Sequence, residues 1–452
     1  MYSLSNRFKI FSLSLIILGS LGWFYSYSKS HLTIEEVKIL LAEESHHGSH
    51  SDHTYSMDHQ NEIHHNEGIH EDDHEAHGHE AHGHEDEHAE HVLHQIHNRP
   101  YAALYVAAFF FMMISLGVLA FYAIQYASQA GWSPVLFRVM EAITYYLLPG
   151  ALIVLLIAII GDKHIFIWMD PEVVAHDKII QGKESWLNKN AFIVRGLIYI
   201  GGWSLYRYFS RKFSLAQDKA NDNKNFKRNF QISAGFLVFF MYTESMMSWD
   251  WIMSVDPHWF STLFGWYIFS EWSAIGFTTI LLFCLFLKKQ GYLEHLNESI
   301  IHDLGKWVFA FSIVWTYMWF SQFMLIWYAN IPEEVTYFME RIELPNYRFL
   351  FWFSAAINFV VPTIMLMSRD AKRNTNLLIT ASITILIGHW INSYLLFAPG
   401  TLHDHGHLGF TELGMGLGFL GLFLFVVFRS LTTRSLEIKH HPFLEESKHL
   451  HT

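Results

Sequence analysis

Several acids and one histidine interrupt apolar stretches of this sequence, and such side chains can take up and release protons. Glu244, Glu271 and His389 fall well inside runs that are otherwise hydrophobic. A charged group at the centre of a bilayer costs roughly 2.5–3.5 kcal/mol on insertion scales, so each needs a reason to be there. One reason is proton transfer, and these three residues are the proton-handling candidates. The other is structural: Arg195 is a candidate charge partner for Glu271, and His389 could join helices by hydrogen bonds together with Asn392, three residues further on.

Further polar residues lie near the ends of these stretches. Asp250, Asp256 and His258 stand in the segment MSWDWIMSVDPHW, where they could form an exit for protons, the rim of a pocket, or only the caps of a turn. Glu141 marks the opposite end of its own stretch and could admit protons there or simply lie in solvent. A carboxylate or imidazole beside an apolar slot is also what a quinol site needs, because it accepts a hydroxyl proton as the ring is oxidised.

The elements that position these residues are predicted to be helices that cross a membrane. Of the 452 residues, 51% are hydrophobic and only 16% are charged, whereas soluble domains average about 25% charged. A helix needs about 20 predominantly apolar residues to span the hydrocarbon. Ten stretches approach or exceed this length: 9–27, 101–126, 138–160, 190–209, 230–252, 259–287, 304–328, 348–368, 375–397 and 409–430. The sequence therefore predicts an all-α polytopic membrane protein of about ten transmembrane helices.

The distribution of basic residues predicts how these helices are oriented. If the N-terminus is cytoplasmic, the inner loops carry most of the Lys and Arg, and the outer loops after the fifth and ninth spans carry none. Because cytoplasmic loops are enriched in Lys and Arg, both termini are expected in the cytoplasm. The first span begins like a signal peptide, with Arg7 and Lys9 before an apolar run, but no small-x-small cleavage site follows. We therefore expect a retained anchor.

A histidine-rich acidic segment separates the first two spans. The stretch HEAHGHEAHGHEDEHAEH repeats the unit HEAHG and contains almost no apolar residues. Such a composition cannot bury a core, so the segment is expected to be flexible or weakly helical, on the periplasmic side. It could act as a solvated tether, or bind metal weakly through His74, His77, His79, His82 and His84. It also inflates the formal charge of −12, and no basic patch suggests a nucleic-acid partner.

Redox metal centres are not expected within this chain. Cys284 is the only cysteine, so CxxC zinc sites, four-cysteine iron–sulfur sites and CxxCH haem attachment are all excluded. Only His389 lies deep in a span, which argues against a haem held between two histidines on facing spans. Electron transfer through this protein would therefore require redox centres on partner subunits.

Two tryptophan-rich segments resemble a known family. MSWDWIMSVDPHWFSTLFGWY (247–267) and YMWFSQFMLIWYANIPEE (317–334) are similar to the smaller of two related membrane subunits in alternative complex III, a quinol:cytochrome c or quinol:electron acceptor oxidoreductase. These subunits are NrfD-like, of the polysulfide-reductase type, and the smaller one is described as quinone-binding. The resemblance runs from about Pro100 to the tail and leaves out the histidine-rich segment.

The resemblance implies both an architecture and a set of partners. Spans two to five and six to nine would form two four-helix bundles, flanked by the first and last spans. The expected division is a 1–28 anchor, a 29–99 histidine-rich segment, bundles at 100–252 and 253–400, and a last helix with a cytoplasmic tail at 401–452. The complex would lie in the bacterial cytoplasmic membrane. Its other members would be the larger homologous membrane subunit, an iron–sulfur protein and multihaem and monohaem cytochrome c subunits, with a terminal oxidase a further candidate partner. Quinone or menaquinone would be the cofactor.

Two other classes of function stay open at this point. A non-catalytic assembly subunit of the same complex would use its polar groups for structure alone. An independent proton- or metal-coupled transporter would need metal ligands within its spans, and one deep histidine with scattered carboxylates fits that requirement poorly.

Overall fold

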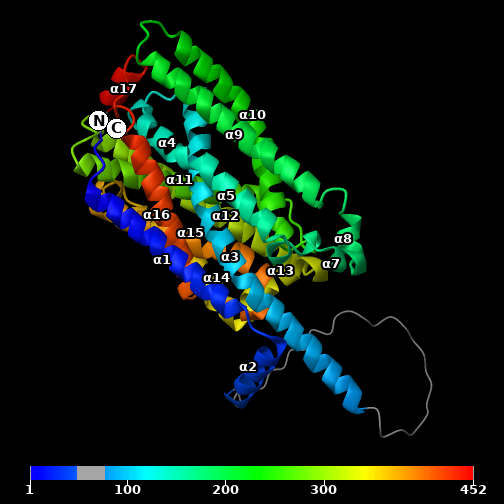
Figure 1. The fold of residues 1–452 in the computed structure, drawn as a ribbon. Coiled ribbons are helices and arrows are strands. Elements are labelled where there is room, and N and C mark those ends of the chain that lie inside the picture. The colour runs from blue at the N-terminus through cyan, green and yellow to red at the C-terminus, as the bar shows by residue number, and fades with distance from the viewer. Residues whose placement is uncertain (1, 48–76, 451–452) are drawn as a thin grey trace.

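The computed structural model describes residues 2–47 and 77–450, and every regular element among them is a helix. The long helices lie side by side, and both termini lie at the same end of the assembly (Figure 1). We call this the termini end, and we call the opposite end, where the short helix α13 (Pro332–Glu343) lies, the α13 end.

Eight helices within the described part of the chain are long and apolar enough to cross a membrane. The prediction of an all-α polytopic membrane protein is therefore confirmed. These segments are Asn6–Ser30, Val92–Ala127, Pro134–Ile160, Phe264–Lys289, Glu298–Ala329, Pro345–Leu366, Thr375–His405 and Phe410–Leu431. The fourth and fifth predicted spans correspond to α9 (Lys189–Gln217) and α10 (Lys224–Trp251), which are 29 and 28 residues long but carry more polar residues.

The residue ranges of the other helices are given in chain order. The candidate membrane spans contain α1 (Asn6–Ser30), α3 (His77–Ala127), α5 (Leu147–Ile160), α11 (Phe264–Lys289), α12 (Glu298–Ala329), α14 (Pro345–Leu366), α15 (Thr375–Leu402) and α16 (Phe410–Leu431). Shorter helices are α2 (Ile34–His47), α4 (Phe137–Ile143), α6 (Asp162–Ile165), α7 (Pro171–His176), α8 (Lys178–Gly182) and α17 (Leu444–Lys448).

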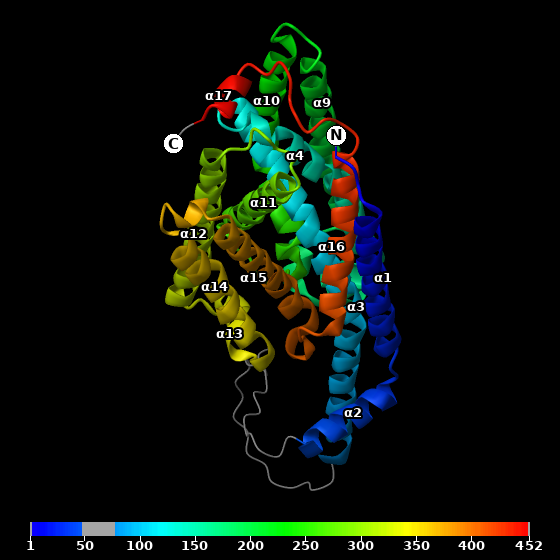
Figure 2. The same ribbon diagram turned by 90° about the vertical axis from the view of Figure 1, so that its left-hand side faces the viewer.

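Two helices differ from their predicted limits. The helix of the second span begins far earlier than residue 101, because α3 runs unbroken from His77 through Pro100, although its apolar span begins at Val92. Its first turns project beyond the other helices and pack against α2 through Val37, Ala89 and Val92 (Figure 2). The third span is divided by the short turn Thr144–Tyr146 between α4 and α5. Pro149 lies in the first turn of α5, and because proline lacks an N–H it cannot donate the backbone hydrogen bond that would continue the ladder of α4 into α5.

Helix α3 lies at the centre of the packing. It contacts α5 and α10 on one side, α11 and α15 on another, and α1 and α16 on a third. Helix α9 packs on α10 and α5, while α14 packs on α12 and α15, and α11 packs on α12 and α15. Residues from both halves of the sequence therefore share one continuous hydrophobic core.

The first and last long helices, α1 and α16, pack against each other closely. A Cβ atom added to Gly19 would lie 2.5 Å from the Cα of Gly418, closer than two carbon atoms can approach. Small residues let transmembrane helices approach until their backbones touch. In lipid the van der Waals contacts made in this way drive helix association, because the hydrophobic effect does not. The opposite face of α1 is exposed, with Ile10, Ile17 and Leu21 available to lipid.

The chain after α16 folds back across the termini end. We call residues 432–450 the C-terminal strap. Ser447 Oγ donates to the Trp132 carbonyl at 2.8 Å, and Gln217 Nε2 donates to the His440 carbonyl at 3.0 Å. These bonds tie the strap to the loop after α3 and to the end of α9, so the strap covers the ends of several helices.

Candidate functional site

Two of the three proton-handling candidates come together between α11 and α15. His389 Nδ1 lies 3.9 Å from Glu271 Oε1, and both side chains are buried. Ser393 Oγ donates a hydrogen bond to the same carboxylate oxygen at 3.2 Å. Within the described residues, the other oxygen of Glu271 and both ring nitrogens of His389 have no hydrogen-bond partner. Buried polar groups are rarely left in this state, so these atoms are available to a proton, a water molecule or a ligand.

The surroundings of this pair are aromatic on one side and polar on the other. Trp315 places its ring edge-on to His389, with centroids 5.0 Å apart. Tyr267 donates its hydroxyl to Asn392 Oδ1 at 2.8 Å. Glu271, His389, Asn392, Ser393 and Tyr267 together are called the Glu271 site below. The prediction that His389 and Asn392 share one face of a helix holds, because both side chains turn toward α11.

A small cavity of about 20 Å³ adjoins the Glu271 site. Tyr267, Asn392, Gln322 and Arg341 contribute its polar walls. A cavity of this size and polarity can hold one water molecule. Because Arg341 belongs to α13, the polar groups continue from the Glu271 site toward the α13 end.

Glu244 forms a second carboxyl site. Trp272 Nε1 donates to Glu244 Oε1 at 3.2 Å, and Ser245 Oγ donates to Oε2 at 3.3 Å. The side chain is only 2% exposed, and none of its hydrogen bonds among the described residues comes from a cation. Since its partners are Trp272 and Ser245 rather than Glu271 or His389, the three candidates form two sites rather than one.

Asp250 is placed differently from the expected exit or pocket rim. Its carboxylate receives two hydrogen bonds from Arg195, at 2.7 and 2.8 Å. Tyr199 donates a third at 2.8 Å and Trp186 a fourth at 2.9 Å. All its acceptor positions are thus occupied, which is the arrangement of a structural ion pair. Arg195 is a charge partner, but its partner is Asp250, so Glu271 has no access to this cation.

Asp256 lines a cavity of about 370 Å³ at the α13 end. Trp186, Trp249 and Trp259 supply aromatic walls, and Lys183 lies at the same cavity. The Lys183 ammonium donates to the carbonyl of Pro257 at 2.5 Å. Asp256 thus lies at the wall of a cavity, and its role as a pocket rim or proton exit stays a prediction.

His258 is not among the residues that line this cavity. Its Nε2 is 2.5 Å from Asp177 Oδ2, and the ring is exposed. Burial of Asp177 works against ionisation, but the backbone N–H of Ile180 and the His258 imidazole together lower the pKa of this carboxyl. His258 therefore makes a surface hydrogen bond with Asp177, the residue that caps the start of α8.

The position of Glu141 contradicts the expectation from the sequence that this residue lies in solvent or admits protons. It is not solvated, because only 4% of it is exposed. Arg138 Nη1 lies 2.6 Å from its carboxylate, and Ser214 and Tyr122 donate to it at 2.6 and 3.0 Å. Arg138 also pairs with Asp218. The C-terminal strap covers this group, since the backbone N–H of Lys439 donates to Asp218 at 2.9 Å, so Glu141 lacks the open contact with solvent that a proton entry requires.

The metal-binding prediction for the histidine-rich repeat, made for His74, His77, His79, His82 and His84, falls on side chains that the structure does not describe. His74 lies outside the described residues, and the backbone of residues 77–88 forms the first turns of α3. Among the side chains that the structure does describe, no three of His, Cys, Asp or Glu are grouped to hold a metal ion.

No family model and no curated protein matches the chain. What the site can do is therefore inferred from its own groups. Glu271 and His389 supply a carboxyl group and an imidazole in van der Waals reach of each other, and the adjoining cavity supplies room for water. This combination can bind a proton, pass it on, and hydrogen-bond a hydroxyl group.

Some residues of the candidate site were not identified from the sequence. Tyr267 lies one turn before Glu271, and this i, i+4 spacing places both on one face of α11. The same rule applied to Arg138 and Glu141, three residues apart, would have predicted their ion pair. Nothing in the sequence links Arg138 to Asp218, which lies 80 positions away.

Glu340, in α13, is a further acid that only the structure reveals. Its side chain is 22% exposed, and Arg341 lies 3.9 Å away. Burial raises the pKa of Glu340 to about 7, although Arg341 opposes this and Asp256 adds to it. A carboxyl whose pKa is higher in the folded state stabilises the fold when protonated. Its contribution is full below its ordinary value of 4.5 and is lost as the pH rises through about 7.

Glu340→Gln is therefore expected to reduce the loss of thermal stability between pH 5 and pH 8. Glutamine stays neutral across this range, so it removes this one contribution to the pH dependence. The measurement is the melting temperature of the purified protein at several pH values. Glu333→Gln, at an exposed position of the same helix, is the matched control and should leave the wild-type profile intact. Identical profiles for wild type and Glu340→Gln would contradict the assignment.

Proposed function

We propose that this chain is an integral membrane subunit of a bacterial respiratory complex that oxidises quinol and reduces cytochrome c or another electron acceptor. In this proposal the chain binds quinol, moves the protons that quinol releases, or does both. Electrons leave through iron–sulfur and haem c centres on partner subunits. The observation that carries the proposal is the Glu271 site. Among the described residues, its buried carboxyl pairs with no Lys or Arg, and it lies 3.9 Å from an imidazole whose two nitrogens have no hydrogen-bond partner.

The chemistry of this pair supports proton transfer. An ionised carboxylate buried without a partner costs several kcal/mol, so Glu271 is suited to holding a proton and releasing it briefly. A neutral imidazole has one donor nitrogen and one acceptor nitrogen. His389 can therefore accept a proton on one side while it donates one on the other, provided that the 3.9 Å gap closes or a water molecule bridges it.

A route toward the α13 end is available to such protons. Asn392 and Tyr267 lead from Glu271 to the cavity of about 20 Å³. Beyond that cavity, Arg341 lies 3.9 Å from Glu340, and the charge of Asp256 acts on Glu340. In the proposal Glu340 and Asp256 form the exit. Glu244 is a second proton-holding site on α10, joined to α11 by Trp272.

The cavity beside Asp256 suits the ring of a quinol. Its walls contain three indoles that can lie against a planar ring, and Asp256 can accept a hydroxyl proton. In the proposal this cavity takes the quinone or menaquinone headgroup. The adjacent α13 end then faces the iron–sulfur and cytochrome c partners on the periplasmic side.

The architecture in the proposal has ten membrane spans, with α9 and α10 completing the set. The packing of α3, α5, α9 and α10 supports one four-helix bundle, and that of α11, α12, α14 and α15 supports the second. Helices α1 and α16 flank both. The basic loops near the termini support a cytoplasmic position for that end, in the bacterial inner membrane.

A second candidate, an assembly subunit without a chemical role, is favoured by a different observation. Asp250, Glu141 and His258 are each held by ion pairs or hydrogen bonds that satisfy them. Three of the titratable groups singled out in the sequence would then serve only to join helices. The Glu271 site distinguishes the candidates, since its groups are not satisfied in this way.

The proposal is tested by purifying the native assembly through an affinity tag on this chain. We expect iron–sulfur and c-type haem proteins to co-elute, and the preparation to oxidise a quinol analogue. Absorbance of reduced haem c and the rate of acceptor reduction are the measurements. A colourless protein that elutes alone from mild detergent would overturn the membership of such a complex.

A further inference from the structure

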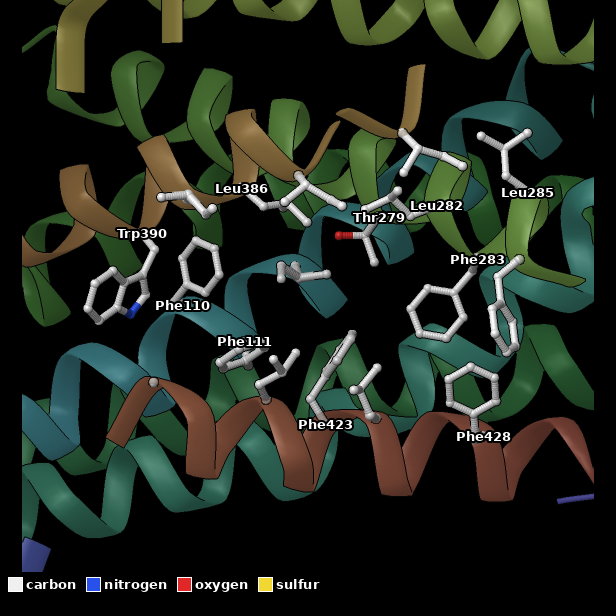
Figure 3. A pocket seen from close by; sticks show the side chains of 18 of the residues that line it. Phe110, Phe111, Thr279, Leu282, Phe283, Leu285, Leu386, Trp390, Phe423 and Phe428 are labelled. Atoms are coloured by element: carbon white, nitrogen blue, oxygen red, sulfur yellow. The ribbon is translucent and has the colours of Figure 1, made fainter. Parts of the chain in front are cut away.

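A large apolar cavity opens on the flank of the protein between α11, α15 and α16. Its volume is about 920 Å³, and α3 forms its floor. Side chains from these helices point into it (Figure 3). The walls are aromatic and aliphatic nearly throughout, and include Phe110, Phe283, Leu386, Trp390, Phe423 and Phe428.

The cavity is suited to hydrocarbon rather than to water. Thr279 points into its middle, but its hydroxyl already donates to the carbonyl of Ile275 at 2.7 Å. Water needs two to four polar partners, and an apolar cavity does not supply them. Ile383, Ile387 and Leu413 line the cavity and remain exposed, so it opens toward the lipid around the helices.

One end of the cavity is basic. Lys288 and Lys289 line it, occupy the last turn of α11 and are exposed. Phe8 also lines the cavity and stands between Arg7 and Lys9 in the sequence. No acidic residue occurs in the first turn of α1 or of α15. An anionic group at this end would thus meet positive charge without a competing carboxylate.

We propose that this cavity binds an anionic phospholipid, with its acyl chains along α11, α15 and α16 and its phosphate beside Lys288 and Lys289. The inference does not depend on the proposed function. A quinone is a poorer occupant, because its ring carries two carbonyl oxygens, and among the described lining residues Trp390 Nε1 is the one buried donor without a partner, the lysines lying at the far end. A helix of another subunit is a poorer occupant too, since close helix packing requires small residues and this cavity is lined by large aromatic ones.

The test measures which lipids stay with the protein and how they stabilise it. The tagged full-length protein is purified from membranes in mild detergent, and its bound lipids are quantified by mass spectrometry. Phosphatidylglycerol and phosphatidylcholine are then added separately to delipidated samples, and the melting temperature is followed. We expect an anionic phospholipid to co-purify, and phosphatidylglycerol to raise the melting temperature at lower concentration than phosphatidylcholine does.

The double variant Lys288→Gln/Lys289→Gln removes the proposed phosphate contact. The concentration of phosphatidylglycerol needed for half of the stabilisation should rise about fivefold for each lysine removed. Lys212→Gln/Lys219→Gln is the matched control, because it removes two exposed charges at the end of α9, away from the cavity. The control should bind phosphatidylglycerol as the wild type does.

A second variant tests the cavity itself without a change of charge. Thr279→Phe fills its middle and should lower the amount of co-purified phospholipid. Equal stabilisation of the wild type by both lipids would overturn the proposal even if a variant failed to fold. Equal weakening of the two lysine pairs would do the same, as would a quinone found in place of phospholipid.

Discussion

Asp250→Asn is expected to lower the free energy of unfolding by roughly 3–5 kcal/mol, because it leaves a buried arginine without its counter-charge. Asp250 is fully buried, and the side chain of Arg195 is only 13% exposed. Asparagine has one oxygen where the native carboxylate has two, so it cannot accept the paired hydrogen bonds at 2.7 and 2.8 Å. The guanidinium of Arg195 would keep its positive charge but lose the carboxylate that neutralises it. The measurement is unfolding in detergent, followed by heat or by a denaturing detergent.

Two further variants isolate the ion pair. Tyr199→Phe removes one hydrogen bond to Asp250 and should cost only about 1 kcal/mol. Asp250→Asn/Arg195→Gln removes both charges together and should be more stable than Asp250→Asn alone. If the single and double variants proved equally unstable, the charge of Arg195 would not be the cause.

Glu271→Gln is expected to slow quinol oxidation in the purified complex by about 10²-fold or more, the range typical of a lost acid–base group. Glutamine has nearly the same volume and can still accept the hydrogen bond from Ser393, so the complex should assemble normally. It cannot, however, release a proton at any pH near neutral. Steady-state turnover and proton release, both normalised to haem c content, are the measurements.

The controls for this variant separate chemistry from structure. Glu333→Gln makes the same chemical change at an exposed position of α13 and should leave turnover unchanged. Glu271→Asp retains a titratable group and should restore part of the activity. Normal turnover in Glu271→Gln, with the complex intact, would favour the assembly subunit instead.

Much of the fold could be predicted because lipid imposes a simple rule. A helix that crosses the hydrocarbon must be apolar over about 20 residues, and such runs are visible without any tertiary information. The same rule says nothing about where a helix continues into water, so the start of α3 at His77 could not be inferred. Nor does it reveal the break between α4 and α5, which depends on how Pro149 fits against its neighbours.

The residues of the candidate site could be predicted from the sequence, but the contacts between them could not. Glu244, Glu271 and His389 were identified because each is costly inside a membrane. Which of them has a partner depends on contacts between distant segments. Arg195 lies 55 positions from Asp250 and was associated with Glu271 instead. Glu141 is buried among Tyr122, Arg138 and Ser214, and the C-terminal strap reaches the same ion-pair group through Asp218, a contact that joins positions 221 apart.

The close fit of Gly19 against Gly418 has a consequence for how this protein is made. The ribosome delivers α1 into the bilayer before α3 to α15, and α16 emerges only after these helices have been synthesised. During that interval the glycine face of α1 has no backbone to meet and is covered by lipid alone. Any nascent chain that stops before residue 410 would leave α1 unattached on that face, where membrane proteases and quality-control factors can recognise it.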